Sequence, residues 1–185
     1  MKKKVIYSII IVSVIIILSV AVTYAVYTFS GVVNISGTSE CFDVNYVKGQ
    51  DIGSDSNPAN FVLASTYTEG LSSVIKVNLK DTCTITNGTG TLYLNTDTSV
   101  TSSTILSGKV LKYQVLDGTT PVGSGIVSSA EGIEIYKDIP ITTTVKTITV
   151  YIWLDGNLVT EQNQNEILSS VYKGHISMDI KSGDK

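Results

Sequence analysis

An uncharged apolar run near the N-terminus constrains this chain more than any other feature. Lys2, Lys3 and Lys4 precede the run, and no charged residue then appears until Glu40. Residues 5–22 are almost wholly Val, Ile, Leu and Ala. Basic residues followed by such a run direct a chain to a membrane with its N-terminus inside. We therefore expect the rest of the protein to be exported, to the cell surface or the extracellular space.

The length of the apolar run leaves two fates open. A secretory signal has an apolar core of about 7 to 15 residues and a spanning helix needs about 20, and this run lies between them. Small residues suit a signal peptidase, with Thr23 at position −3 and Ala25 at position −1. We expect cleavage between Ala25 and Val26, which makes residues 1–25 a signal peptide. The alternative is a retained membrane anchor that keeps the exported part at the cell surface.

The charge balance argues against nucleic acid as a partner. The formal net charge is −3, although three of the thirteen basic residues precede the apolar run, and the sequence contains no arginine. Nucleic-acid binding requires a cationic surface and commonly uses bidentate arginine contacts. We therefore expect no nucleic-acid partner.

Beyond Ala25 the sequence alternates with a period of two almost throughout, which is typical of half-buried β-strands. The alternation is strongest over residues 144–154 and clear over 111–115 and 176–180. About nine short strands separated by Gly, Asn and Asp indicate an all-β fold. We expect residues 26–185 to form one antiparallel β-sandwich, of the jelly-roll or the immunoglobulin-like type.

Turn signals predict several of the connections. Asn87 and Gly88 predict a hairpin between a strand over residues 75–79 and one over 92–95. The stretch "LDGTTPVGSG", residues 116–125, is expected to turn the chain, and a short helical turn is expected at 166–169.

Cys41 and Cys83 are the two cysteines of the chain. In an exported protein such a pair most simply forms a disulfide, the alternative being two buried thiols that do not meet. Closing a loop of this size would stabilise the fold by about 4 kcal/mol in the chain-entropy model. We expect the disulfide.

Catalysis finds little support in the sequence. His175 is the single histidine and no HExxH motif is present, which argues against a zinc protease and against a histidine-dependent triad. Glu131 with Glu134, or Asp155 with Glu161, could form a glycosidase pair, although exposed turn acids are the simpler interpretation. An exported hydrolase is therefore a remote alternative.

One loop has the residues that a calcium ion prefers. Asp51, Asp55 and Asn57 place three oxygen-bearing side chains close together in the sequence, and such ligands suit a hard cation outside the cell. Their spacing does not match the pattern of known calcium loops, so an ordinary Asx-rich turn is the competing interpretation. No other cofactor is expected.

Aromatic residues on the strand with the strongest alternation could offer a binding surface. Tyr151 and Trp153 alternate along it and Asp155 follows. Such side chains could form a platform for a glycan or a surface protein, and plain packing against the sheet is the alternative. An adhesin-like binding module is therefore the second functional hypothesis.

Three stretches occur in an order shared with one known group of proteins. They are "AVTYAVYTFSG" at the end of the apolar run, "VIKVNLKDTCTITNGTGTLYLN", and "TITVYIWLDGN" with the later "YKGHISMDI". In these stretches the chain resembles the TasA/camelysin-like exported proteins of Gram-positive bacteria. The resemblance implies a jelly-roll domain at the cell surface or in the extracellular matrix. In some members the freed N-terminal segment completes the sheet of a neighbour and builds a fibre.

The segment that would be donated in this chain is residues 26–35. It is uncharged, and Tyr27, Phe29, Val33 and Ile35 share one face of the expected strand. Addition of a strand to an open sheet edge is a general recognition mode. The leading hypothesis is a non-enzymatic structural protein that associates with itself, held at the membrane until its N-terminal segment is cleaved.

Overall fold

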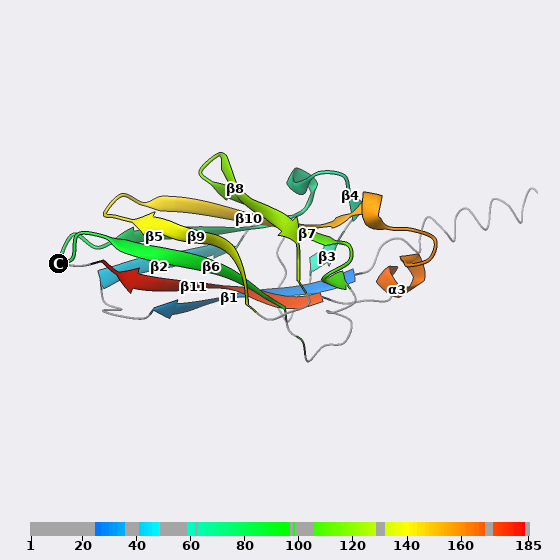
Figure 1. Cartoon of the computed structure of the whole chain (residues 1–185), viewed down its shortest axis with the longest axis horizontal. Coiled ribbons are helices and arrows are strands. Elements are labelled where there is room, and N and C mark those ends of the chain that lie inside the picture. The colour runs from blue at the N-terminus through cyan, green and yellow to red at the C-terminus, as the bar shows by residue number, and fades with distance from the viewer. Residues whose placement is uncertain are drawn as a thin grey trace, which may run out of the picture.

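The computed structural model describes residues 25–35, 41–48, 59–61, 63–96, 98, 106–128, 132–168 and 172–183. Their strands form two sheets that are mostly antiparallel and follow the long axis of the molecule (Figure 1). The expected all-β architecture is therefore confirmed.

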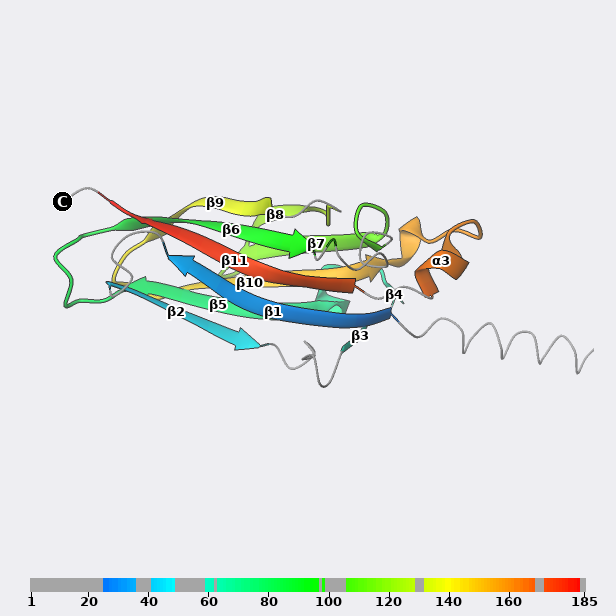
Figure 2. The ribbon, with the colours of Figure 1, turned by 90° about the horizontal axis from the view of Figure 1, so that it is seen from below.

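The first sheet has the strand order β3-β1-β11-β6-β9. Its strands are β1 (Ala25–Ile35), β3 (Ala59–Phe61), β6 (Gly88–Thr96), β9 (Ile133–Ile141) and β11 (Tyr172–Ser182). β1 runs parallel to β11, whereas β6 runs antiparallel to both β11 and β9. The first and last strands of the described chain are therefore neighbours (Figure 2).

The second sheet has the order β2-β5-β10-β7-β8, and the short β4 also pairs with β10. Its strands are β2 (Phe42–Lys48), β4 (Leu63–Ala64), β5 (Leu71–Leu79), β7 (Leu111–Asp117), β8 (Thr120–Ile126) and β10 (Lys146–Asp155). Short helices lie in the connections: η2 (Tyr67–Glu69), η3 (Gly156–Leu158) and α3 (Gln164–Leu168).

Alternating side chains of both sheets meet in one apolar core. Because successive residues of a strand point to opposite faces, every second residue of β5 is buried, among them Ile75 and Val77. Leu92 of β6 and Ile176 of β11 enter the same cluster from the first sheet. Removal of this apolar surface from water is the main force that holds the sheets together.

The two sheets also approach each other directly along one side. β8 and β9 are edge strands of different sheets, and Gly123 of β8 lies against the carbonyl oxygen of Ile135 on β9. A Cβ at position 123 would collide with that oxygen, so glycine allows this close approach.

One expected connection is wrong and another is incomplete. Asn87 and Gly88 do not close a hairpin, since β5 and β6 belong to different sheets and residues 80–87 cross between them. The stretch 116–125 does more than turn the chain, because it includes most of β8, which pairs with β7 from Thr120 onward. As an edge strand, β8 tolerates Pro121, whose missing N–H would interrupt a central strand. The expected helical turn is present as α3, slightly earlier in the chain.

Candidate functional site

β1 lies between the C-terminal strand and a very short edge strand. It is in register with β11 over nine pairs, from Tyr27 opposite Tyr172 to Ile35 opposite Ile180. With β3 it shares three pairs, which begin at Ala25 opposite Phe61. Within the described residues, β11 is therefore the main partner of the β1 backbone.

The register sets alternate positions of β1 beside buried positions of β11. In order, the partners of Tyr27, Phe29, Gly31, Val33 and Ile35 are Tyr172, Gly174, Ile176, Met178 and Ile180. All five of these β11 residues are buried. The positions that the sequence assigns to one apolar face of the donor segment thus share the row of β11 that faces the core.

The expected cleavage site coincides with the start of β1. Ala25 and Val26 are its first two residues, whereas Thr23 lies outside the described residues. A cut between Ala25 and Val26 would keep all nine pairs with β11, because that register begins at Tyr27. Processing and strand pairing are therefore compatible.

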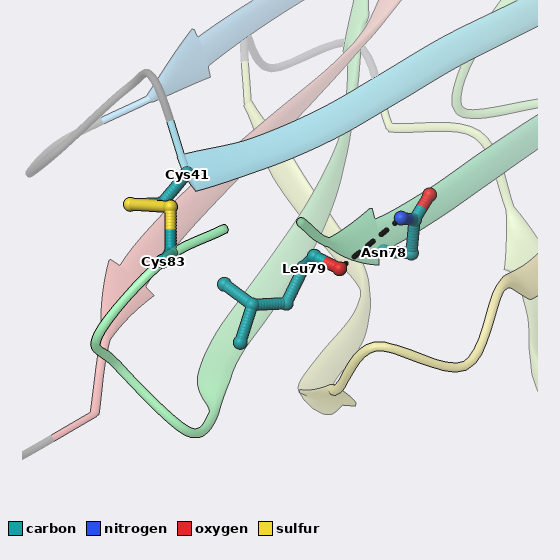
Figure 3. The surroundings of a disulfide bond; sticks show 4 residues. All are labelled: Cys41, Asn78, Leu79 and Cys83. Carbon is teal, nitrogen blue, oxygen red and sulfur yellow. Dashed lines mark hydrogen bonds between the residues drawn. A yellow bond between two sulfur atoms is a disulfide. The ribbon is translucent and has the colours of Figure 1, made fainter. Parts of the chain in front are cut away.

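The expected disulfide is present and fixes the chain soon after β1. Cys41, immediately before β2, is bonded to Cys83 in the loop after β5, with a Cα–Cα distance of 5.6 Å (Figure 3). The backbone N–H of Lys80 donates to the carbonyl of Cys41 at 2.9 Å. The start of β2 is thus bonded covalently to the loop after β5, and this bond does not involve β1.

Trp153 is covered by a turn. The ring of Tyr67, on η2, lies 5.0 Å from the ring of Tyr151 and 6.4 Å from that of Trp153. Trp153 is only 8% exposed, and its indole Nε1 has no hydrogen-bond partner among the described residues. Gly70 permits the turn to lie so close, because a Cβ there would meet the Cβ of Trp153. Of the expected aromatic surface, only the half-buried Tyr151 reaches solvent appreciably.

Asp155 is held within the protein. Its carboxylate accepts from the ammonium of Lys112 at 2.6 Å and from the backbone N–H of Asn157 at 3.0 Å. The hydrogen bond from Lys112, together with those from Asn157, lowers the pKa of Asp155 against the opposing effect of burial. Asp155 thereby caps η3, a structural task. Glu161, the possible partner of Asp155 in a carboxylate pair, is exposed, as the simpler interpretation of a turn acid requires.

The turn of the β7–β8 hairpin and the connection between β9 and β10 enclose a depression that the sequence did not reveal. We call it the Asp117 depression; it has a volume of about 470 Å³ and is lined by Asp117, Gly118, Pro140, Thr142, Thr144, Val145, Lys146 and Thr147. Asp117 and Lys146 form an ion pair of 2.7 Å, and each side chain is about one fifth exposed. The hydroxyl of Tyr136 donates to the same carboxylate oxygen at 2.9 Å.

The hydrogen bonds at the Asp117 depression determine the protonation states of Asp117 and Tyr136. Burial raises the pKa of Asp117, but hydrogen bonds from Lys146 and Tyr136 and the charge of Lys146 outweigh it, so the pKa lies below its ordinary value. Burial and the hydrogen bond to Asp117 raise the pKa of Tyr136 to about 12. At neutral pH the carboxylate is therefore ionised and the phenol keeps its proton.

Of the remaining candidate residues, the structure describes His175 and Glu134. His175 is partly exposed on β11 and Glu134 is exposed on β9. The positions that lie outside the described residues are Asp51, Asp55, Asn57 and Glu131. In the described ranges, no three His, Cys, Asp or Glu side chains are grouped so that they could hold a metal ion. The same ranges contain no helix long and apolar enough to cross a membrane.

The function of the chain must be inferred from its own residues and geometry. Comparison with protein-family models, with curated proteins and with solved structures gives no match.

Proposed function

We propose that this chain is an exported structural protein without enzymatic activity, which assembles at the cell surface or in the extracellular matrix by donating β1 to a neighbouring copy. The strongest support is the position of β1, an N-terminal strand that pairs over nine residues with the C-terminal strand β11. The resemblance to the TasA/camelysin-like proteins, with a jelly-roll domain, agrees with this mode of assembly.

Departure of β1 would leave β11 with one open edge. β11 lies between β1 and β6, so the backbone groups of residues 172–180 that face β1 would lose their partners. The buried row that contains Ile176 and Met178 would also lose its neighbouring strand. Unpaired backbone groups and exposed apolar rows are costly, and an exposed edge is a template for another strand. The β1 of a second copy has the same sequence, so it could restore both the backbone pairing of β11 and the strand beside its buried row.

The disulfide would confine this exchange to the N-terminal segment. Since Cys41 is bonded to Cys83, β2 stays in the second sheet of its own chain when β1 leaves. The same contacts form whether β1 pairs within its own chain or with a neighbouring copy. The protein concentration and any strain in the segment that follows β1 therefore decide which pairing prevails. Cleavage after Ala25 would remove the membrane segment that limits where β1 can pair.

A pair of cysteines across the β1–β11 boundary tests the proposal. Asn34 and Asp179 are register partners, so Asn34→Cys with Asp179→Cys can form a disulfide wherever β1 is seated. If β1 is donated, oxidation of assembled protein gives a ladder of multimers on a non-reducing gel. Cross-linking confined to monomers, in samples that nevertheless contain fibres, would contradict strand donation.

A matched pair in the second sheet provides the control. Lys76 of β5 and Thr147 of β10 are also register partners, and both strands lie after the disulfide-bonded Cys41. Lys76→Cys with Thr147→Cys should cross-link only within one chain. Sequencing of the exported protein should also find Val26 at its N-terminus, because donation requires release from the membrane segment.

A further inference from the structure

We propose that the Asp117 depression is a binding site for neutral sugars and that it recognises two adjacent hydroxyl groups. This site is separate from β1, so it does not depend on strand donation. It also differs from the surface expected around Trp153, which a turn covers.

The polar groups of the depression retain hydrogen-bonding capacity. Oδ2 of Asp117 accepts from both Lys146 and Tyr136, whereas Oδ1 accepts no hydrogen bond from the described residues. The ammonium of Lys146 has three N–H donors, of which the described residues accept one. A ligand can therefore donate to Oδ1 and accept from Lys146 at neighbouring points.

The charges indicate that the ligand is neutral. Asp117 and Lys146 are 2.7 Å apart, so each would repel an ion of its own sign that approached the other. A hydroxyl group is both a donor and an acceptor, and hydrogen bonds to charged groups are the stronger ones. Two adjacent sugar hydroxyls satisfy the pair, one donating to Asp117 and the next accepting from Lys146.

The walls suit the less polar face of a sugar ring. Val145 is 55% exposed and Pro140 lies in the same lining, so both offer apolar surface to a ligand. Threonines 142, 144 and 147 add hydroxyl groups. The volume of about 470 Å³ falls within the range of small-molecule sites, about 300 to 1,000 Å³.

Tyr136 prepares the carboxylate for binding. It belongs to β9 in the first sheet, whereas Asp117 and Lys146 belong to β7 and β10 in the second. Donors from two sheets hold the carboxylate in one orientation before any ligand arrives. Such preorganisation reduces the entropy lost on binding.

The test titrates the full chain, in a detergent without a sugar headgroup, with cellobiose, maltose, lactose and diacetylchitobiose, by calorimetry. We expect at least one disaccharide to bind. Asp117→Asn and Val145→Asp should each weaken that binding by about tenfold, the loss expected for one hydrogen bond to a charged group or for a spoiled apolar wall. Val145 is exposed, so its substitution should leave the fold intact.

Lys112→Met is the matched control, because it breaks the ion pair with Asp155, and neither residue lines the depression. It should leave the dissociation constant unchanged. Absence of binding by all four disaccharides would overturn the proposal. So would binding that Asp117→Asn and Val145→Asp both leave unchanged, or a preference for inorganic phosphate over every sugar.

Discussion

Tyr136 of β9 donates a hydrogen bond of 2.9 Å to Asp117 of β7, and this contact joins the two sheets. Lys146 of β10 donates to the same oxygen at 2.7 Å. Hydrogen bonds to an ionised acceptor are stronger than those between neutral groups. The carboxylate of Asp117 therefore links three strands, β7, β9 and β10.

Tyr136→Phe removes the donor and keeps the ring. We expect the free energy of unfolding to fall by about 1 kcal/mol, below the range of about 1.5 to 3 kcal/mol for a hydrogen bond to a charged group, because the site is partly exposed. Urea unfolding measures the change. Tyr113→Phe is the control, because burial alone raises the pKa of Tyr113 and no hydrogen bond contributes to the shift. Equal losses in the two variants would show that the hydrogen bond contributes nothing.

Acid should weaken the fold through two carboxylates. Although burial opposes it, hydrogen bonds lower the pKa of Asp117 and of Asp155 in the folded chain. The unfolded chain therefore binds protons more readily as the pH falls below about 4. Stability from these groups is present above that pH and is lost as the pH falls through the folded-state values.

The double variant Asp117→Asn with Asp155→Asn should respond less to acid. We expect its urea midpoint to change less than that of the native chain between about pH 5 and pH 2. Midpoints measured across that range supply the comparison. Parallel curves would mean that other groups govern acid unfolding.

The disulfide should account for a large part of the stability. Its half-cystines are 42 residues apart, for which the chain-entropy model gives about 4 kcal/mol. Cys41→Ser with Cys83→Ser should lower the free energy of unfolding by about that amount. A reductant should destabilise the native chain to a similar extent and leave the double variant unaffected. A native chain that is insensitive to full reduction would contradict this expectation.

Asp138 has a left-handed backbone, with φ of 54°, at the irregular part of β9. Aspartate and asparagine tolerate this conformation, whereas a β-branched residue does not. We expect Asp138→Val to destabilise the fold by about 1 to 2 kcal/mol, and Asp138→Asn to have little effect. Lys137→Val, at the exposed neighbouring position, is the control in thermal unfolding. A similar cost at both positions would rule out backbone strain as the cause.

The faces of the strands could be predicted from the sequence because alternation is a property of one strand alone. Val150 and Ile152 are buried on β10 as the pattern requires, and Ile176 and Met178 are buried on β11. Strand partners could not be predicted in this way. A period of two is the same whichever strand lies beside it, so neither the parallel pair β1–β11 nor the separation of β5 from β6 is visible in the pattern.

The Asp117 depression escaped prediction for a related reason. Asp117, Tyr136 and Lys146 belong to three strands in two sheets, and each is an ordinary residue in its own segment. Their proximity follows from register and from the packing of one sheet on the other. The disulfide was easier to predict, because a chain with two cysteines allows only one pairing.

The parallel pairing of β1 with β11 also determines how the fold bears tension. β1 begins at Ala25 and β11 ends at Ser182, and parallel strands place these two points at opposite ends of the sheet (Figure 1). A pull on both points drags β1 lengthwise along β11 and loads the hydrogen bonds of all nine pairs together. Single-molecule pulling from these points should therefore give a higher rupture force than pulling that peels β1 from one end. The strand that an assembling copy would share is thus also the one placed to resist shear.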